Sequence, residues 1–411
     1  MKRVLIISYN FPPKSGISSR RWAKLAKALT RKGVECFVLT RNGGKESGFN
    51  WTRDIQELNP KNIIEISSPY PRVLERSKSS FFFRVFKYFG IKLLKSSLFP
   101  IDAAQLWYKK LLPEAKKIID EGVRNVIVTG PPHSVMYQMA VLKYENPHIN
   151  FILDYRDAWN DEINYKLFSG IKRFSEKFQS IQKELFSLNC ANSVLLVTND
   201  MNKRLGYTFQ HLSHKFITLH NFFDSEDYTN AKEFPETQKD IVYLGSLKSG
   251  RREAIKLLIE ALIILEKRDF RFNHKFHFYT DDHFFFFFKN PDEQFILKKY
   301  FQIHPIIDSA EVAQILNKFE FCLSINDPTY SHAFGTKIFD YMALKKKIVH
   351  ISNGGELYNL LKEKEHYVAY YDINDLVDQL VTLNTIEFKG NTDFSSFDLN
   401  SKANELFQLL Q

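Results

Sequence analysis

Cysteine is scarce in this sequence, and its spacing suggests neither a disulfide framework nor a metal site. Cys36, Cys190 and Cys322 lie far apart among 411 residues, each inside an apolar stretch. A small secreted domain would need more cysteines, and a zinc site would need closely spaced pairs. We therefore expect buried, reduced thiols and a cytoplasmic protein.

Long apolar runs are also missing. The opening MKRVLIISYN has a basic start but only a short apolar stretch, whereas a secretory signal needs an apolar core of about 7–15 residues. No segment approaches the roughly 18–20 apolar residues of a membrane-spanning helix. The sequence predicts a cytoplasmic location, with peripheral contact at the inner face of the cell membrane as an option.

Several motifs of cofactor and metal enzymes are absent. The first strand-turn lacks Gly-x-Gly-x-x-Gly, and no Gly-x-x-x-x-Gly-Lys-Ser/Thr loop occurs, which argues against nicotinamide, flavin and common nucleoside-triphosphatase sites. His-Glu-x-x-His is missing, as is an Asp-x-Asp that would hold a divalent metal against a diphosphate. The sequence therefore predicts no cofactor and no metal.

The composition is that of a folded chain of two or three domains. Hydrophobic residues make up 44% and charged residues 25% of the chain. The net charge of +10 favours an anionic partner: a membrane surface, nucleic acid or a phosphorylated substrate. The run Phe284–Phe288 fits a buried strand edge, an insertion loop or an exposed patch equally well.

Short apolar runs alternate with helical patterns along most of the chain. Strands are expected at residues 3–8, 35–40, 62–67, 125–130, 150–155, 193–198, 215–220, 240–245, 275–280, 319–325 and 347–352, with helices at 20–33, 134–147, 251–268 and 336–346 among others. This alternation indicates parallel sheets covered by helices on both faces. The polar stretch 221–240 reads as a linker. We expect an α/β chain of two Rossmann-like doubly wound domains that face each other across a cleft.

In open parallel sheets, ligands bind beyond the carboxyl ends of the strands. The first loop there, FPPKSGISSRRW, contains Gly16 before a basic helix. It is either a loose surface turn or a place where the backbone approaches an anionic ligand. The second loop, VTGPPHS, presents His133 after two prolines. That histidine is either structural or a group that exchanges a proton or a hydrogen bond with a substrate.

The third loop, DYRDAWND, places Asp154, Arg156 and Asp157 at a strand end. A salt-bridged loop and a substrate contact are equally consistent with these residues. The fourth loop, YLGSLKSGRR, runs from Gly245 to two arginines at a helix start. Cations oppose the helix dipole there, so a bound diphosphate would account for them better than open solvent does.

The fifth loop lies in HAFGTKIFDYMALKKKIV. Gly335 and Thr336 precede a helix that carries Lys337 and Asp340 in its first turns. A carboxylate there can accept hydrogen bonds from both hydroxyls of a ribose, as acids do in other nucleotide sites. This loop therefore predicts a nucleotide contact.

Together these segments resemble the GT-B glycosyltransferases, specifically glycosyltransferase family 4. The resemblance runs over most of the chain and includes all five loops. It implies a retaining, metal-independent transfer of a sugar from a nucleotide-diphosphate donor of the UDP or GDP type. It also implies an acceptor-side domain at 1–222, a nucleotide-sugar-binding domain at 241–385, and a C-terminal tail at 386–411 whose helix packs back on the first domain.

The resemblance also implies residue roles. Gly16 matches the glycine loop that faces the donor diphosphate and the acceptor, and His133 matches the histidine near the reacting sugar. The cationic pair on the diphosphate falls on Arg251 or Arg252, with Lys256 one helical turn on. We expect His133 and Arg252 to be catalytic and the other residues of the five loops to bind substrate.

Two residues depart from the family's pattern. Its two glutamates fall on His332 and Asp340. Asp340 keeps the charge that would hold the ribose, whereas His332 replaces the acid that contacts the donor sugar. A catalytically degenerate donor-binding protein is therefore an alternative. The opening loop also has one glycine where many relatives have two.

A basic, aromatic segment points to the acceptor. Residues 77–101 contain five lysines and arginines and no acid, and FFFRVFKYFGIKLLKSSLF within them reads as an amphipathic helix. Such helices lie at anionic membrane surfaces, although this one could instead cap the core of the first domain. On the membrane interpretation the acceptor is a lipid-linked saccharide of surface polysaccharide biosynthesis.

Two other functions compete with sugar transfer. A nucleotide-sugar epimerase or hydrolase could use the same scaffold, although an epimerase usually needs more acid–base carboxylates. A basic peripheral membrane protein without catalysis is the second alternative. Nucleic-acid binding is not expected, because the cations gather at strand-end loops and in one helix rather than interleaving with aromatics along one face.

Overall fold

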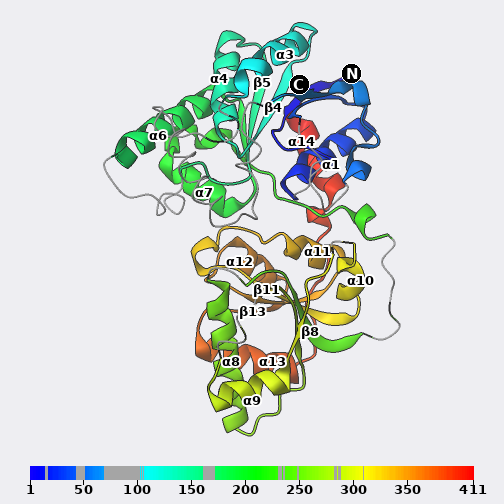
Figure 1. The fold of residues 1–411 in the computed structure, drawn as a ribbon, viewed down its shortest axis with the longest axis vertical. Helices are drawn as coiled ribbons and strands as arrows, with labels where there is room; N and C mark the ends of the chain where they lie inside the picture. Colours follow the sequence, from blue (N-terminus) through cyan, green and yellow to red (C-terminus); the bar gives the residue numbers. More distant parts are fainter. Residues whose placement is uncertain are drawn as a thin grey trace, which may run out of the picture. The chain divides into compact units, whose positions relative to one another are not determined.

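The computed structural model describes residues 1–13, 17–42, 51–68, 102, 104, 106–160, 172–229, 234, 237–247, 250–281, 285, 288–308 and 310–411. These residues form two compact units. Unit 1 comprises Met1–Val197, Asn202–Leu219 and Ala403–Gln411, and unit 2 comprises Thr198–Met201 and His220–Lys402. Each unit is built on one parallel sheet flanked by helices (Figure 1), so the predicted α/β doubly wound class is confirmed.

The sheet of unit 1 has seven strands in the order β3-β2-β1-β4-β5-β6-β7, all paired in parallel. The strands are β1 (Arg3–Ile7), β2 (Glu35–Arg41), β3 (Ile63–Ile66), β4 (Asn125–Gly130), β5 (Asn150–Tyr155), β6 (Ser193–Leu196) and β7 (Phe216–Thr218). All seven were expected from their apolar runs. β4 and β5 are buried along their whole length, as strands covered on both faces must be.

The helices of unit 1 connect these strands. They are α1 (Ile17–Arg31), α3 (Tyr108–Asp120), α4 (Ser134–Glu145), α6 (Lys172–Cys190), most of α7 (Asn199–Thr208) and most of α14 (Leu399–Leu409). One side of α1 buries Trp22, Leu25 and Leu29. Its basic side is neutralised by the segment beside it, because Asp54 accepts hydrogen bonds from Arg20 at 2.7 and 3.0 Å.

The C-terminal helix α14 packs on unit 1, as the sequence predicted. Two asparagines at the amino ends of β4 and β5 hold its end. Nδ2 of Asn125 donates to the carbonyl of Gln411 at 3.1 Å, and Nδ2 of Asn150 donates to that of Leu409 at 2.9 Å. Lys2 also donates to the carbonyl of Phe407 at 3.4 Å.

The sheet of unit 2 has six parallel strands in the order β10-β9-β8-β11-β12-β13. They are β8 (Gln238–Leu244), β9 (Phe276–Tyr279), β10 (Phe301–His304), β11 (Phe319–Ile325), β12 (Lys347–Ile351) and β13 (Tyr367–Ala369). The sequence did not predict β10 and β13. Both are short strands at the edges of the sheet, and β10 exposes Gln302 and Ile303, so neither presents a long apolar run.

Helices cover both faces of this sheet. Helices α8 (Arg251–Lys267), α9 (Pro291–Tyr300) and α13 (Ile373–Thr385) share one core, and α10 (Val312–Leu316), α11 (Lys337–Ala343) and α12 (Glu356–Glu363) share the other. Alternate residues of β8 serve the two cores: Ile241 and Tyr243 belong to the first, Val242 and Leu244 to the second. This period-2 division is the geometry of a strand buried on both faces.

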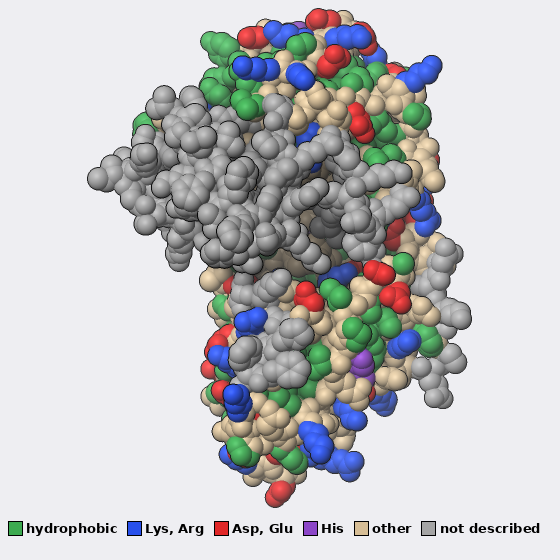
Figure 2. Space-filling view, viewed as in Figure 1, with side chains coloured by type: hydrophobic (Ala, Val, Ile, Leu, Met, Phe, Trp, Pro, Cys, Tyr) green, Lys and Arg blue, Asp and Glu red, His purple; other side chains and the backbone are tan. Residues whose placement is uncertain are grey.

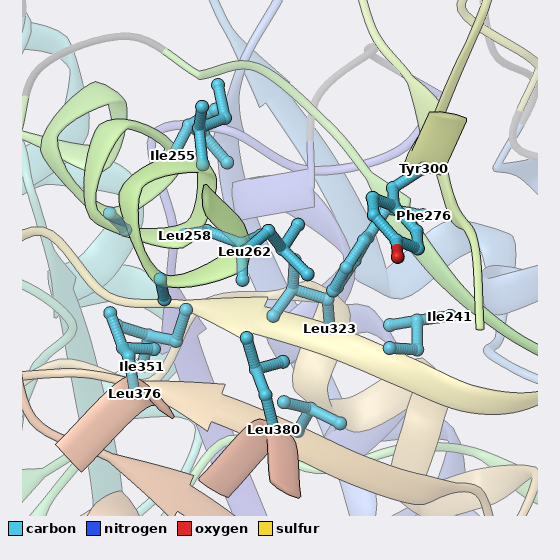
Figure 3. Close-up of a cluster of buried hydrophobic side chains, with 14 of the residues drawn as sticks. Ile241, Ile255, Leu258, Leu262, Phe276, Tyr300, Leu323, Ile351, Leu376 and Leu380 are labelled. Carbon is cyan, nitrogen blue, oxygen red and sulfur yellow. The ribbon is translucent and has the colours of Figure 1, made fainter. Parts of the chain in front are cut away.

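The first of these cores is shown in Figure 3, where Leu258 and Leu262 of α8 and Leu380 of α13 point toward Leu323 on β11. Two members of the phenylalanine run join this core. Phe285 and Phe288 are 8% and 7% exposed, while residues 284, 286 and 287 lie outside the described residues. The described part of the run is therefore core and not an exposed patch.

A buried histidine in unit 2 links stability to pH. His350 on β12 is fully buried, with Nδ1 3.1 Å from Oγ of Ser324, and burial lowers its pKa from 6.5 to about 3. Between these pH values the unfolded chain binds a proton that the native protein does not, so stability rises with pH. The stability that depends on an uncharged His350 is fully present above about pH 6.5 and is lost as the pH falls toward 3.

We expect His350→Leu to flatten this dependence. The slope of the unfolding free energy against pH should fall by about 1.4 kcal/mol per pH unit between about pH 5.5 and 4, because one proton no longer distinguishes the two states. Urea unfolding followed by circular dichroism in both proteins measures the slopes. A packing change alone would shift the profile at every pH, so parallel profiles would contradict the assignment.

Candidate functional site

Both sheets reverse their strand order beside their first strand, which marks where ligands bind. β1 neighbours β2 and β4, and β8 neighbours β9 and β11. In doubly wound sheets a ligand lies beyond the carboxyl ends of the strands at such a switch point. The loops that follow β1 and β4, and those that follow β8 and β11, are four of the five that the sequence singled out. The remaining loop follows β5, the neighbour of β4.

Asp154 lies inside unit 1, where three donors from other segments meet it. Its side chain is 0% exposed. It accepts hydrogen bonds from Nε1 of Trp22 at 2.6 Å, Oγ1 of Thr129 at 2.7 Å and Nη2 of Arg21 at 3.2 Å. Arg21 also donates to the carbonyl of Leu219 at 2.8 Å. Asp154 therefore joins α1, β4 and β5 below the carboxyl edge, and its described position suits holding the loops rather than touching a substrate.

Hydrogen bonds from Arg156 link the loop after β5 to the loop after β4. The amide of Arg156 donates to the carbonyl of Gly130 at 3.1 Å, and Nη2 of Arg156 donates to that of Pro131 at 2.6 Å. Burial lowers the pKa of Arg156, against the opposing effect of Asp154 and Asp157. Arg156 thus holds the two loops together, whereas the neighbouring Asp157 is exposed.

His133 sits where these two loops meet. Its Nε2 lies 3.1 Å from the carbonyl oxygen of Asp157, and its ring stacks on Trp159 with centroids 5.3 Å apart. A carbonyl can only accept, so Nε2 carries the proton and Nδ1 is left as an acceptor. Burial lowers the pKa of His133 to about 4. At neutral pH the ring is therefore uncharged.

Asp102 belongs to this region, although no sequence pattern pointed to it. Its carboxylate accepts hydrogen bonds from the amide of Ser134 at 2.7 Å and from the Ser134 hydroxyl, at the start of α4. It thereby caps the helix that follows His133. The two partners are separated by 32 positions, beyond the reach of a local capping pattern. Gly16 lies outside the described residues.

In unit 2 a buried aspartate joins the loops after β8 and β11. Asp327 accepts hydrogen bonds from the amide of Gly250 at 2.9 Å and from the amide and hydroxyl of Thr329 at 2.9 and 2.7 Å. Burial alone would raise its pKa, but these bonds outweigh it and the pKa is lowered. A Cβ at position 250 would lie 2.5 Å from Cδ of Pro328, so the close approach requires glycine. The sequence Asp-Pro-Thr, a turn and capping signal, could have revealed Asp327.

The two arginines at the start of α8 have different surroundings. Arg251 folds back on the protein, donating to the carbonyls of Ile325 at 3.2 Å and Ser246 at 3.3 Å. Arg252 and Lys256 are exposed and one helical turn apart, so they share a face of α8. Of the two arginines, Arg252 is thus the exposed one, and it shares a face of α8 with Lys256, which forms an ion pair with Glu253 at 3.9 Å. Gly245, with φ of +133°, allows the turn that leaves β8.

Asp340 is held at the start of α11. It accepts a hydrogen bond from the hydroxyl of Tyr228 at 2.6 Å and forms an ion pair with Lys337 at 3.4 Å. It keeps partial exposure, as do His332 and Gly335 in the preceding loop, and Thr336 is exposed. The carbonyl of His332 accepts from Thr198 at 2.9 Å. His332, Gly335 and Thr336 lie in the segment between β11 and α11, and Asp340 lies in α11 itself.

The loop after β12 is a further part of the edge that the sequence analysis missed. Glu356 accepts hydrogen bonds from Nε2 of His220 at 2.7 Å and from Nδ2 of Asn199 at 2.6 Å. A Cβ at Gly355 would lie 2.4 Å from the carbonyl oxygen of Ser331, so this loop touches the one that carries His332. The pair of glycines in SNGGE was the available signal.

Within the part of the chain that the structure describes, no group of three or more His, Cys, Asp and Glu residues is placed to hold a metal ion. Among the same residues, no helix is both long and apolar enough to cross a bilayer.

No protein-family model and no curated protein matches the sequence. Solved structures match it over its whole length. A glycosyltransferase from Rickettsia africae gives a TM-score of 0.59 at 14% identity, over 99% of this chain and 97% of that one. Sucrose-phosphate synthase from Thermosynechococcus elongatus gives 0.57 at 12%, over 100% and 98%. UDP-GlcNAc 2-epimerase from Methanocaldococcus jannaschii gives 0.50 at 12%, over 100% and 99%.

The chain has the GT-B fold. The fold that the resemblance implied is therefore confirmed. At these identities the similarity shows the fold alone.

Substitution of Asp154 tests whether its hydrogen bonds hold α1, β4 and β5 of unit 1 together. In Asp154→Asn, one carboxylate oxygen is replaced by an NH2 group, which cannot accept the hydrogen bonds that reach Asp154. The charge of Arg21 is also left buried without its carboxylate, so the free energy of unfolding should fall by about 3–5 kcal/mol. All four tryptophans lie in unit 1, so urea unfolding followed by tryptophan fluorescence reports on it.

The matched control is Asp157→Asn, three positions on. Its carboxyl is exposed and only its backbone carbonyl contacts His133, so the loss should stay within about 0.5 kcal/mol. Equal losses in the two variants would refute the role assigned to Asp154.

Proposed function

We propose that the protein is a retaining, metal-independent glycosyltransferase that moves a sugar from a UDP- or GDP-type donor to a saccharide acceptor in surface polysaccharide biosynthesis. The observation that carries this proposal is the exposed pair Arg252 and Lys256 at the start of α8, beyond the carboxyl end of β8. This pair follows β8, at the switch point of the unit 2 sheet, where a ligand of a doubly wound sheet is expected.

A diphosphate suits this place electrostatically. Glu253 in the first turn of α8 forms an ion pair with Lys256 at 3.9 Å, and the amide of the N-cap Gly250 donates to Asp327 at 2.9 Å. The positive end of the helix dipole and the exposed side chains of Arg252 and Lys256 would still favour a ligand with two negative charges. In the transfer, Arg252 and Lys256 would stabilise the charge that develops on the departing diphosphate. Arg251 would hold the loop through its two carbonyl contacts.

Asp340 would bind the ribose of the same donor. Tyr228 and Lys337 hold its carboxylate by hydrogen bond and ion pair while leaving it partly exposed. A carboxylate fixed in this way can accept from vicinal hydroxyls. His332, Gly335 and Thr336 would lie along the sugar-diphosphate part of the donor, and Gly245 would allow the neighbouring loop to approach it.

His133 would face the reacting sugar as a neutral group. Since Nε2 donates to the carbonyl of Asp157, Nδ1 remains to accept a hydrogen bond from a sugar hydroxyl. A neutral ring adds no positive charge beside an oxocarbenium-like transition state, which a protonated histidine would destabilise. The pKa of about 4 keeps it neutral at physiological pH.

We propose a lipid-linked saccharide as the acceptor, with the basic segment 77–101 at the membrane surface. This segment and Gly16 lie outside the described residues, so the support is the sequence pattern alone. Where Figure 2 displays the described surface, lysine and arginine side chains are interspersed with aspartate and glutamate. The net charge of +10 is thus not gathered into one patch on that face.

A nucleotide-sugar 2-epimerase is the second candidate, favoured by the similarity to the epimerase structure at a TM-score of 0.50. The two activities differ in what they need. An epimerase converts UDP-GlcNAc to its 2-epimer with no acceptor present, whereas a transferase leaves the configuration at that carbon unchanged. Nuclear magnetic resonance of UDP-GlcNAc incubated with the protein distinguishes them.

A thermal-shift series tests the donor site. Among UDP, GDP, ADP, CMP and their common sugar conjugates, we expect the compounds of one base to raise the melting temperature, because a ligand at 100 times its Kd stabilises the native state by about 2.7 kcal/mol. The shift given by the diphosphates and their sugar conjugates should fall markedly in Arg252→Ala and Asp340→Ala. Lys267→Ala, at the far exposed end of α8, is the control and should keep it.

The unliganded variants should melt within a few degrees of the parent, since both side chains are at least partly exposed. A cooperative transition that none of these nucleotides moves would count against the proposal. So would a diphosphate shift that is as large in Arg252→Ala as in the parent.

A further inference from the structure

A buried glutamate lies behind the loop that carries Trp159. Glu184 on α6 is 1% exposed, and its Oε2 accepts a hydrogen bond from Nδ2 of Asn160 at 2.5 Å. The same carboxyl lies beside Tyr155, the fully buried last residue of β5, whose pKa is raised by burial and by the nearby Glu184. Glu184 therefore contacts residues at both ends of the loop formed by residues 156–160.

The opposite side of this loop faces His133. The carbonyl of Asp157 accepts from His133 at 3.1 Å, and Trp159 stacks on the histidine ring with an angle of 10° between the planes. Tyr155 lies between the two groups, its ring centroid 6.0 Å from that of His133. The loop is thus fixed between the imidazole on one side and the α6 carboxyl on the other.

Packing alone does not account for an acid at this position. Among the described residues, neither Oε1 of Glu184 nor the hydroxyl of Tyr155 has a hydrogen-bond partner of good geometry. Burial raises the pKa of Glu184 to about 7, which reflects the unfavourable transfer of a carboxylate out of water. A leucine or methionine would fill the same space without this penalty. The acid instead makes polar contacts with Asn160 and Tyr155.

We propose that Glu184 is a positioning residue for His133. By holding Asn160 and lying against Tyr155, it sets the loop so that Trp159 keeps the imidazole ring in the orientation in which Nδ1 can meet a substrate hydroxyl. The chemistry of this inference rests on the proposed function, since it concerns the histidine assigned to the reacting sugar. The geometry that it predicts can be measured without any activity.

Fluorine resonances of the full chain labelled with 5-fluorotryptophan test that geometry. The four signals belong to Trp22, Trp51, Trp107 and Trp159, and the loss of one signal in Trp159→Phe assigns the last. In Glu184→Ala we expect the Trp159 signal to move or broaden. The Trp22 and Trp107 signals, from buried residues bonded to Asp154 and to the carbonyl of Ile66, should stay in place and show that unit 1 is folded.

Two variants make this a test of the contact with Asn160. Glu184→Gln keeps an oxygen that can accept from Asn160, so the Trp159 signal should return to its parental position. Asn160→Ala removes the same bond from the loop side and should reproduce the effect of Glu184→Ala, which matters if that variant does not fold. Gln182→Ala, on an exposed position of the same helix, is the control.

An unmoved Trp159 signal in both Glu184→Ala and Asn160→Ala overturns the inference, whether or not the protein transfers a sugar. A displaced Trp159 signal in a protein that no nucleotide stabilises supports the inference and counts against the proposed function alone. Where transfer is measurable, Glu184→Ala should lower kcat by about tenfold or more, because misplaced catalytic groups are costly. The donor KM should stay near the parental value, since the proposed donor residues belong to unit 2.

Discussion

The fully buried carboxylate of Asp154 is the interaction on which the rest of the unit 1 site depends. A charge with no access to water is tolerated only when donors surround it, and here the donors come from α1 and β4. Satisfying this one group brings together α1, β4 and β5, the segments that border the first three candidate loops. Asp327 has a comparable task in unit 2, where it joins the loop before α8 to the loop after β11. In each unit, a buried aspartate holds the segments at the switch point together, and other residues there are left exposed for contact with a ligand.

Charged residues that are close in sequence also differ in role, because one is enclosed by the protein and the other is exposed. Arg251 is bound to backbone carbonyls, whereas Arg252 is exposed on α8. In the other unit, Asp154 is enclosed and Asp157 is exposed. The enclosed member of each pair contributes to stability and geometry, so its removal would disturb the fold. The exposed member can be exchanged with little structural cost, which makes it the informative position for studying ligand binding.

The sequence predicted the fold well because apolar runs separated by helical patterns have few other solutions than parallel sheets. The short edge strands β10 and β13 were not predicted, since edge strands need no continuous apolar run. Within the site, loops could be found because each follows a predicted strand, but the direction of a side chain could not. Asp154 was grouped with substrate-binding residues, yet its partners Arg21 and Trp22 stand 133 and 132 positions away. Contacts of that range, like the one between Tyr228 and Asp340, leave no local pattern.

The decisive measurement for diphosphate binding at the start of α8 is titration calorimetry with nucleoside mono- and diphosphates of one base. If Arg252 and Lys256 meet the diphosphate, UDP or GDP should bind at least about tenfold more tightly than the corresponding monophosphate, since each charge-assisted hydrogen bond contributes about 1.5–3 kcal/mol. Arg252→Ala should remove most of that difference while leaving the weaker binding of the monophosphate. Equal affinities for mono- and diphosphate in the parent protein, or a preference unchanged in Arg252→Ala, would show that Arg252 and Lys256 do not bind the diphosphate.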